Sequence, residues 1–124
     1  MSQLKNSVLG ASIFLGIFIS SIALAHTKLI SSTPSEGDDV TDPTVIELHF
    51  SNDLVPQFSK GKLVMVDDSG SNVSVDVNVS NSDDKKTLLL MPASHLLAGN
   101  YRLEWRVVSS DSHPVLGHLS FEVK

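Results

Sequence analysis

A carboxylate and an imidazole stand two residues apart in the segment Asp111-Ser112-His113-Pro114. In extended chain, residues i and i+2 project to the same side, so both side chains could reach one ligand. Pro114 favours extended backbone at His113, because proline disfavours the helical region for the residue before it. The alternative is a turn in which Asp111 caps a backbone amide and His113 faces solvent. The segment is a candidate for half of a metal site.

The first 25 residues have the pattern of a secretory signal peptide. One charge, Lys5, precedes the apolar run Val8 to Leu24, which ends in the small-residue motif Ala23-Leu24-Ala25. The competing interpretation is a membrane anchor, although a helix of this length spans only about 25 Å of a hydrocarbon core of about 30 Å. Cleavage after Ala25 would remove a single charged side chain and change the net charge from −5 to −6.

The same cleavage would make His26 the first residue of the mature chain, residues 26–124. A terminal histidine offers its α-amine and its imidazole, which can close a chelate ring on one metal ion. The α-amine has a pKa of about 7.7 to 8.0, so a metal ion displaces its proton at neutral pH. Together with Asp111 and His113, His26 gives three nitrogen donors and one oxygen donor. Such a set favours Cu(II), with Zn(II) as the second choice. The alternative is that His26 occupies this position by chance.

The other histidines are predicted to be structural. His49 alternates with apolar neighbours and should face outward, His95 lies in a short loop, and His118 is on the polar side of the last strand, where it could at most assist the site. Met65 and Met91 are the only methionines after the leader, and the chain has no cysteine. Soft ligands for Cu(I) are therefore lacking.

Composition argues against several other functions. The chain of 124 residues has 9 Lys and Arg against 14 Asp and Glu and no basic run, which argues against nucleic-acid binding. No serine lies in a G-x-S-x-G motif, and the carboxylate pairs lie in turn-like segments with few aromatic residues nearby, so acyl transfer and glycoside hydrolysis are not supported. A mature chain of about 100 residues can bury one core.

Alternating hydrophobicity after residue 26 predicts an all-β domain. Ile46, Leu48 and Phe50 alternate with polar residues, as do Leu119, Phe121 and Val123. About seven strands suit a β-sandwich or barrel. A single helical turn is expected at 93–97. The predicted strands are 28–32, 46–51, 62–67, 73–79, 87–91, 101–108 and 118–123.

The residues resemble those of the CopC family of periplasmic copper-resistance proteins. The similarity lies in the start at His26-Thr27-Lys28-Leu29, in Ile46-Glu47-Leu48-His49-Phe50-Ser51, and above all in Trp105 to Pro114. It extends over essentially the whole mature chain. The resemblance implies a seven-stranded Greek-key sandwich or barrel, cupredoxin-like or Ig-like, with one Cu(II) bound per chain by His26, Asp111 and His113.

Two departures from the family pattern limit what the resemblance implies. Some members have a glutamate just after the Phe-Ser pair, whereas this chain has Asn52 followed by Asp53, so neither is assigned to the metal. Some members also bind Cu(I) in a methionine-rich loop, and the corresponding stretch 66–79 has no methionine. The chain is therefore expected to bind Cu(II) alone.

The expected function is that of a non-enzymatic periplasmic carrier for copper homeostasis or resistance. It would be a monomer that does not span the membrane, and it would buffer copper or deliver it to a CopD-like inner-membrane transporter. One alternative is a copper oxygenase that uses an N-terminal histidine. The other is a β-sandwich interaction module whose histidines bind no metal.

Overall fold

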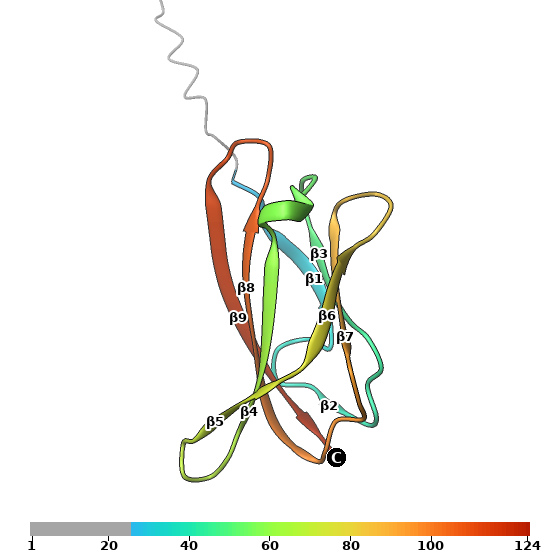
Figure 1. The fold of residues 1–124 in the computed structure, drawn as a ribbon, viewed down its shortest axis with the longest axis vertical. Coiled ribbons are helices and arrows are strands. Elements are labelled where there is room, and N and C mark those ends of the chain that lie inside the picture. The colour runs from blue at the N-terminus through green and yellow to red at the C-terminus, as the bar shows by residue number, and fades with distance from the viewer. Residues whose placement is uncertain (1–25) are drawn as a thin grey trace, which may run out of the picture.

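The computed structural model describes residues 26–124, which form two β-sheets packed face to face (Figure 1). The predicted leader, residues 1–25, lies outside the described residues. Within 26–124, the structure contains no helix with the length and apolar character needed to cross a bilayer. The predicted all-β sandwich is confirmed.

One sheet has four strands and the other has five. The four-stranded sheet has the order β1 (Leu29–Thr33), β3 (Ile46–Phe50), β7 (Thr87–Pro92) and β6 (Val77–Asn81). The five-stranded sheet has the order β2 (Asp39–Val40), β9 (Pro114–Val123), β8 (Gly99–Val108), β4 (Lys60–Val66) and β5 (Asn72–Val75). A 3-10 turn, η1 (Pro56–Phe58), precedes β4. Many sheet neighbours are not consecutive in sequence, because the chain crosses between the sheets in the Greek-key manner.

The strand prediction was correct in outline. It differs at several strand ends, most of all in β9, which begins at Pro114 and not at residue 118, and in three further places. The segment predicted as one strand at 73–79 is two strands separated by Asp76, and β5 pairs with β4 while β6 pairs with β7 in the other sheet. The two-residue strand β2, parallel to β9, was not predicted. The helical turn expected at 93–97 was wrong: the segment is irregular, and the Ala93 amide donates to the Asp76 carbonyl at 2.9 Å.

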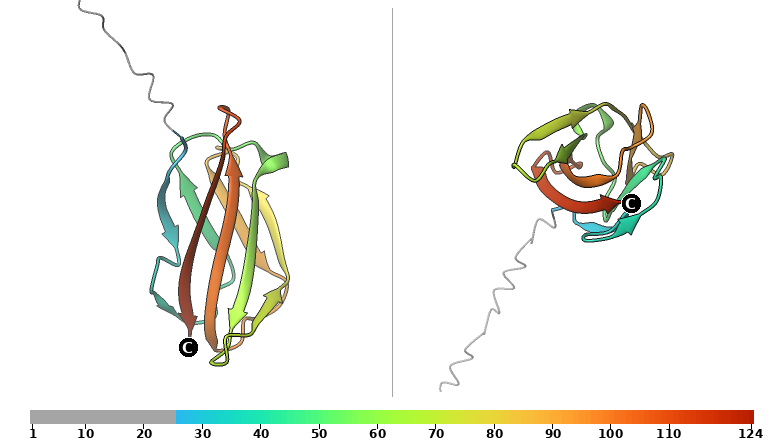
Figure 2. Two further views of the ribbon diagram at one scale, coloured as in Figure 1. Left: turned by 90° about the vertical axis from the view of Figure 1, so that its left-hand side faces the viewer. Right: turned by 90° about the horizontal axis from the view of Figure 1, so that it is seen from below.

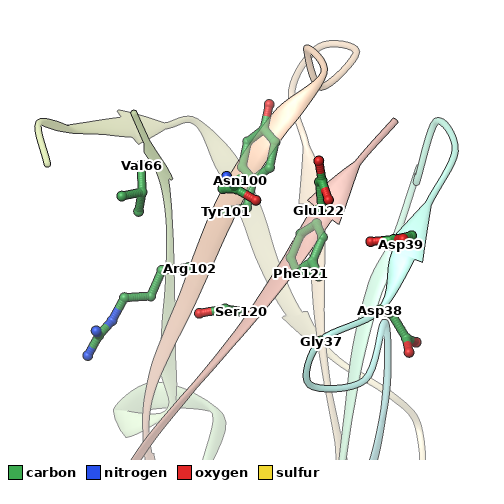
Figure 3. Close-up of a pocket in the computed structure, with 10 residues that line it drawn as sticks. All are labelled: Gly37, Asp38, Asp39, Val66, Asn100, Tyr101, Arg102, Ser120, Phe121 and Glu122. Atoms are coloured by element: carbon green, nitrogen blue, oxygen red, sulfur yellow. The ribbon is translucent and has the colours of Figure 1, made fainter. Parts of the chain in front are cut away.

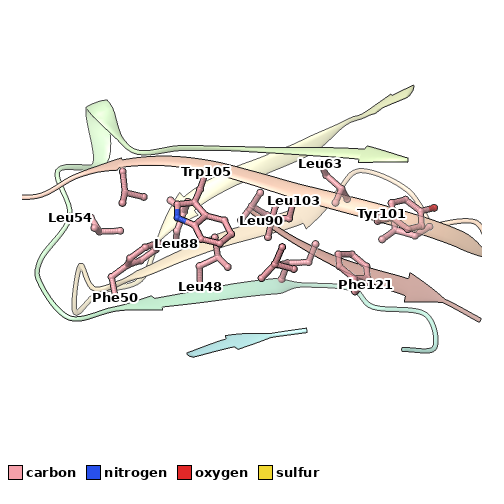
Figure 4. Close-up of a cluster of buried hydrophobic side chains, with 14 of the residues drawn as sticks. Leu48, Phe50, Leu54, Leu63, Leu88, Leu90, Tyr101, Leu103, Trp105 and Phe121 are labelled. Carbon is pink, nitrogen blue, oxygen red and sulfur yellow. The ribbon is translucent and has the colours of Figure 1, made fainter. Parts of the chain in front are cut away.

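The alternating apolar residues fill the space between the sheets (Figure 4). Ile46, Leu48 and Phe50 from β3 are almost completely buried, and the inward residues of β9 meet them from the opposite sheet. Burial of such side chains contributes about 1.5–3 kcal/mol each. The period-two pattern therefore determines which face of each strand forms the core.

Trp105 lies in this core between two glycines. Gly61 of β4 and Gly117 of β9 stand directly opposite it on the neighbouring strands. A β-carbon at Gly117 would overlap the indole ring, and one at Gly61 would lie 2.6 Å from a methyl carbon of Leu90. The indole also meets the ring of Phe50 edge to face, with centroids 6.4 Å apart. The absence of a side chain at Gly117 therefore makes room for Trp105, the largest residue of the core, and its absence at Gly61 makes room for Leu90.

The longest strands, β8 and β9, form a hairpin along the whole sandwich (Figure 2). Their connecting turn lies at the same end of the molecule as the first described residues, which lead into β1. The C-terminus lies at the other end (Figure 1). This arrangement brings residue 26 near residues 109–113 even though they are far apart in sequence.

Candidate metal centre

The β8–β9 turn is held by its own backbone and by the buried Ser109. The Ser112 amide donates to the Ser109 carbonyl at 3.0 Å, and Ser112 adopts a left-handed φ of 65°. Ser109 also forms an isolated bridge with Leu54 in the connection after β3. Asp111 lies in this turn and His113 is exposed, so the alternative interpretation of the segment, a turn with an aspartate cap, is confirmed and the extended conformation at Asp111 is not observed.

The side chain of Asp111 explains this conformation. Its Oδ1 accepts a hydrogen bond from the His113 amide at 3.1 Å and another from the Ser109 hydroxyl at 2.9 Å. An aspartate that accepts from the amide two residues later stabilises a turn at the expense of a strand. The same hydrogen bonds, first from the His113 amide and then from Ser109, lower the pKa of Asp111. The carboxylate is thus fixed and ionised while its Oδ2 remains available.

His26 contacts the Oδ2 atom of Asp111. The segment is tethered by Thr27, which is buried, and by Lys28, whose amide donates to the Ser51 hydroxyl at 2.9 Å. The Nδ1 atom of His26 lies 3.2 Å from Oδ2 of Asp111. The histidine side chain is 55% exposed and the aspartate side chain only 17%. An exposed imidazole therefore faces a carboxylate that is held in place.

His113 completes the cluster. Its ring centroid lies 5.4 Å from that of His26, and the two rings are nearly perpendicular at 86°. The structure thus brings together all three residues predicted from the sequence. Among residues 26–124, however, no three His, Cys, Asp or Glu side chains already converge as a metal-binding group. At least one imidazole must rotate before three side chains can point at one ion.

The donor atoms fit a small divalent ion after that rotation. Metal–ligand bonds of about 2.0–2.2 Å place two ligand atoms at neighbouring corners of a square about 2.9 Å apart. The 3.2 Å between His26 Nδ1 and Asp111 Oδ2 is close to this separation. Nitrogen and carboxylate oxygen donors suit Cu(II) and Zn(II). His113 is exposed, so its ring can turn without disturbing the core.

The other histidines lie apart from this cluster, as predicted. His49 faces outward from β3 and its Nδ1 lies 2.9 Å from the Thr87 hydroxyl. His95 pairs with Asp42 at 2.9 Å in an exposed loop. His118 is exposed on the outer face of β9, opposite Glu104 of β8. It stands four residues beyond Pro114, about 13 Å along the strand.

Sequence reasoning missed the residues that support the cluster. Ser109 donates to the carboxylate of Asp111, and Ser51 holds the backbone of the segment after His26. The Ser51 hydroxyl also donates to Oδ1 of Asn52 at 2.7 Å, so the amide oxygen of Asn52 has a local partner. The supporting role of Ser109 could have been predicted from its position two residues before an aspartate, because a hydroxyl at that spacing can reach the carboxylate.

A hollow of about 400 Å³ lies at the opposite end of the sandwich, near β2 (Figure 3). It has no histidine, and the carboxylates of Asp39 and Glu122 lie within 4 Å of the ammonium group of Lys124. It therefore does not compete with the cluster of His26, Asp111 and His113 as a metal site. The lining residues are Gly37, Asp38, Asp39, Val66, Asn100, Tyr101, Arg102, Ser120, Phe121 and Glu122.

Comparisons with known proteins agree with the sequence resemblance. The profile of the CopC domain matches residues 29–124. Copper resistance protein C of Pseudomonas syringae pv. tomato is 50% identical over 112 residues, covering 88% of this chain and 89% of that protein. Copper resistance protein C of Escherichia coli is 38% identical over the full length of both chains.

A solved structure gives the same result for the fold. The crystal structure of PcoC, described as a methionine-rich copper resistance protein from Escherichia coli, superposes with a TM-score of 0.76 and 42% sequence identity. The match covers 81% of this chain and all of that one. Matches of this identity and coverage in both sequence and structure establish the family. The chain belongs to the CopC family of copper resistance proteins.

Proposed function

We propose that the protein is a non-enzymatic periplasmic carrier that binds one Cu(II) per chain through His26, Asp111 and His113. The observation that carries this proposal is the contact of His26 Nδ1 with Asp111 Oδ2 at 3.2 Å, beside the ring of His113. Membership of a copper resistance family supports copper as the metal.

The coordination we propose uses four donors. Signal-peptide cleavage after Ala25 frees the α-amine of His26, which joins its own Nδ1 in a chelate ring. Oδ2 of Asp111 and the imidazole of His113 supply the other two positions. Hard nitrogen and oxygen donors in a square arrangement stabilise Cu(II) over Cu(I). The absence of cysteine and the small number of methionines, three in the whole chain, argue in the same direction.

The fixed carboxylate gives the site one rigid corner. Asp111 is held by Ser109 and by the His113 amide before any metal arrives, whereas the imidazoles of His26 and His113 are exposed, with room to rotate. Copper can therefore enter and leave by movement of side chains alone. We propose that the ion is buffered in this way and handed to a CopD-like inner-membrane transporter.

The experiment that tests the proposal is a competitive Cu(II) titration followed by EPR. It compares protein that begins at His26 with the same protein carrying one additional N-terminal glycine. The additional residue turns the α-amine into an amide and leaves every side chain unchanged. We expect one tightly bound Cu(II) in the first protein and weaker binding, with an altered EPR spectrum, in the second.

Two outcomes would contradict the proposal. Equal affinity and identical spectra would remove the amine from the coordination sphere. A lack of specific Cu(II) binding in both proteins would contradict the carrier function itself and favour an interaction module. Zn(II), titrated in parallel, shows whether the site selects copper.

A further inference from the structure

The outer face of β4, β8 and β9 gathers positive charge on an acidic chain. Residues directly opposite one another in antiparallel strands share a face of the sheet. Lys60 of β4 lies opposite Arg106 of β8, which in turn lies opposite Leu116 of β9. In the next row, Lys62 lies opposite Glu104. We call the surface formed by these five residues the basic face.

The charges of this face are incompletely neutralised. The carboxylate of Glu104 is engaged by Arg102, whose Nε lies 3.1 Å from its Oε1. Among the described residues, Lys60, Lys62 and Arg106 take part in no salt bridge. Like charges directly opposite one another, as Lys60 and Arg106 are, destabilise a sheet. An anionic partner would relieve this repulsion.

The face also has an apolar and hollowed part. Leu116 is 73% exposed and lies beside Arg106. A hollow of about 340 Å³ is lined by Lys60, Lys62, Arg106 and Leu116, among others. A partner that covers this area would bury an apolar side chain on Leu116 while its carboxylates meet the cations.

A second hollow lies between the basic face and the β8–β9 turn. It has a volume of about 290 Å³ and is lined by Phe58, Arg106, Ser109 and Ser112, with other residues of the same turn. Arg106 therefore borders both hollows. Ser109 donates to Asp111, so a partner seated here touches the turn that carries two of the three proposed ligands.

We propose that the basic face is the docking surface for an acidic protein segment with an apolar side chain, and that docking places this partner beside the copper turn. The inference rests on the proposed copper-carrier function, for which it specifies the chemistry of the partner. Because Lys60, Lys62 and Arg106 have no acidic partner among the described residues, the basic face favours a negatively charged partner. The net charge of −6 on residues 26–124 disfavours approach to an anionic lipid surface, whereas a short acidic segment contacts only the basic face.

The test uses ¹⁵N-labelled protein beginning at His26, which contains both sheets and the entire core. The probe is a seven-residue synthetic peptide with leucine at its centre and Glu or Asp elsewhere. We expect amide shift changes confined to β4, β8, β9 and the 109–113 turn, with binding that weakens as salt is added. The double variant K60E/R106E should bind at least about tenfold more weakly, because like charges then face one another.

The control variant is K85E/K86E, which makes the same change of charge in the loop before β7. It should bind the peptide as the unmodified protein does. Equal loss in both double variants would mean that net charge alone attracts the peptide, and would overturn the proposal. So would shift changes on other strands, or tighter binding to phosphatidylglycerol vesicles than to the peptide.

Cu(II) titration of the same variants separates this inference from the proposed function. K60E/R106E leaves all proposed ligands intact, so its Cu(II) affinity should be unchanged. Normal copper binding without peptide docking would refute the docking surface alone. Peptide docking in a protein that binds no Cu(II) would refute the carrier function and, with it, the link between docking and copper transfer.

Discussion

Two histidine–aspartate pairs in this chain have similar contacts and different surroundings. His26 Nδ1 lies 3.2 Å from Asp111, and His95 Nδ1 lies 2.9 Å from Asp42. By distance alone, the second pair is the closer one. Only the first, however, lies beside another imidazole, that of His113.

The carboxylates differ more than the histidines do. Asp111 is 17% exposed and one of its oxygens is held by two hydrogen bonds within its turn. Asp42 is 55% exposed in a loop, and its partner His95 is 85% exposed. A single ion pair at the surface contributes little because water and salt screen it. The comparison teaches that a held carboxylate and a third donor, rather than a short contact, distinguish the candidate site.

The largest expected difference between the pairs is in metal affinity. Replacement of Asp111 by alanine should weaken Cu(II) binding by at least about 100-fold, since even partners outside the coordination sphere contribute about 10–100-fold. The matched variant D42A should bind Cu(II) as the unmodified protein does. Competitive titration measures both constants. Equal affinities in the two variants would show that the pairs do not differ as proposed.

A smaller effect should follow from loosening Asp111 without removing it. The variant S109A deletes one of the two hydrogen bonds to Oδ1 and leaves every proposed ligand in place. We expect Cu(II) to bind about tenfold more weakly, as for other residues that orient a ligand. The EPR spectrum should keep the parameters of the unmodified site. A changed spectrum would show that Ser109 alters the ligand set itself.

For the exposed pair of His95 and Asp42, we expect protein stability to depend on protonation of the histidine. Asp42 raises the pKa of His95 above 6.5, by its hydrogen bond first and by its charge second. A raised pKa in the folded state stabilises the protein below the unfolded pKa, and this contribution disappears as pH rises through the folded value. D42N should lower the pKa of His95 in an NMR titration. Its melting temperature should fall below that of the unmodified protein near pH 5.5 and match it near pH 8.5.

The smallest effect is expected in the stability of the metal-free protein. H26A and H95A both remove exposed side chains, and surface substitutions rarely change stability much. Each should melt within about 3 °C of the unmodified protein. Only H26A should then lose the stabilisation that added Cu(II) gives by binding the folded state. A large loss without metal would show that His26 supports the fold.

Much of the fold could be predicted because the alternation of apolar and polar residues can be recognised within a single strand. The alternation of Ile46, Leu48 and Phe50 identified a half-buried strand without any knowledge of its partners. The strand β2 has two residues and therefore no period to detect. The division at Asp76 depends on the pairing of each half with a different sheet, which the sequence does not encode locally.

The candidate site was predictable in its members and not in its geometry. Residue types and spacing identified Asp111 and His113, and the leader pattern identified His26. The sequence allowed both an extended segment and a turn at Asp111, because residue spacing does not say whether a side-chain hydrogen bond or strand pairing is the stronger. Support by Ser109 likewise depends on its burial against the connection after β3.

Trp105 is the only tryptophan of the chain, and it is buried in the core against Phe50 and Gly117. Its intrinsic fluorescence therefore reports on a single location, four residues or about 13 Å along β8 from Ser109. The protein has a natural optical probe in its core, on the strand that leads to the proposed copper turn. Emission intensity can follow both unfolding and the arrival of a paramagnetic ion without any added label.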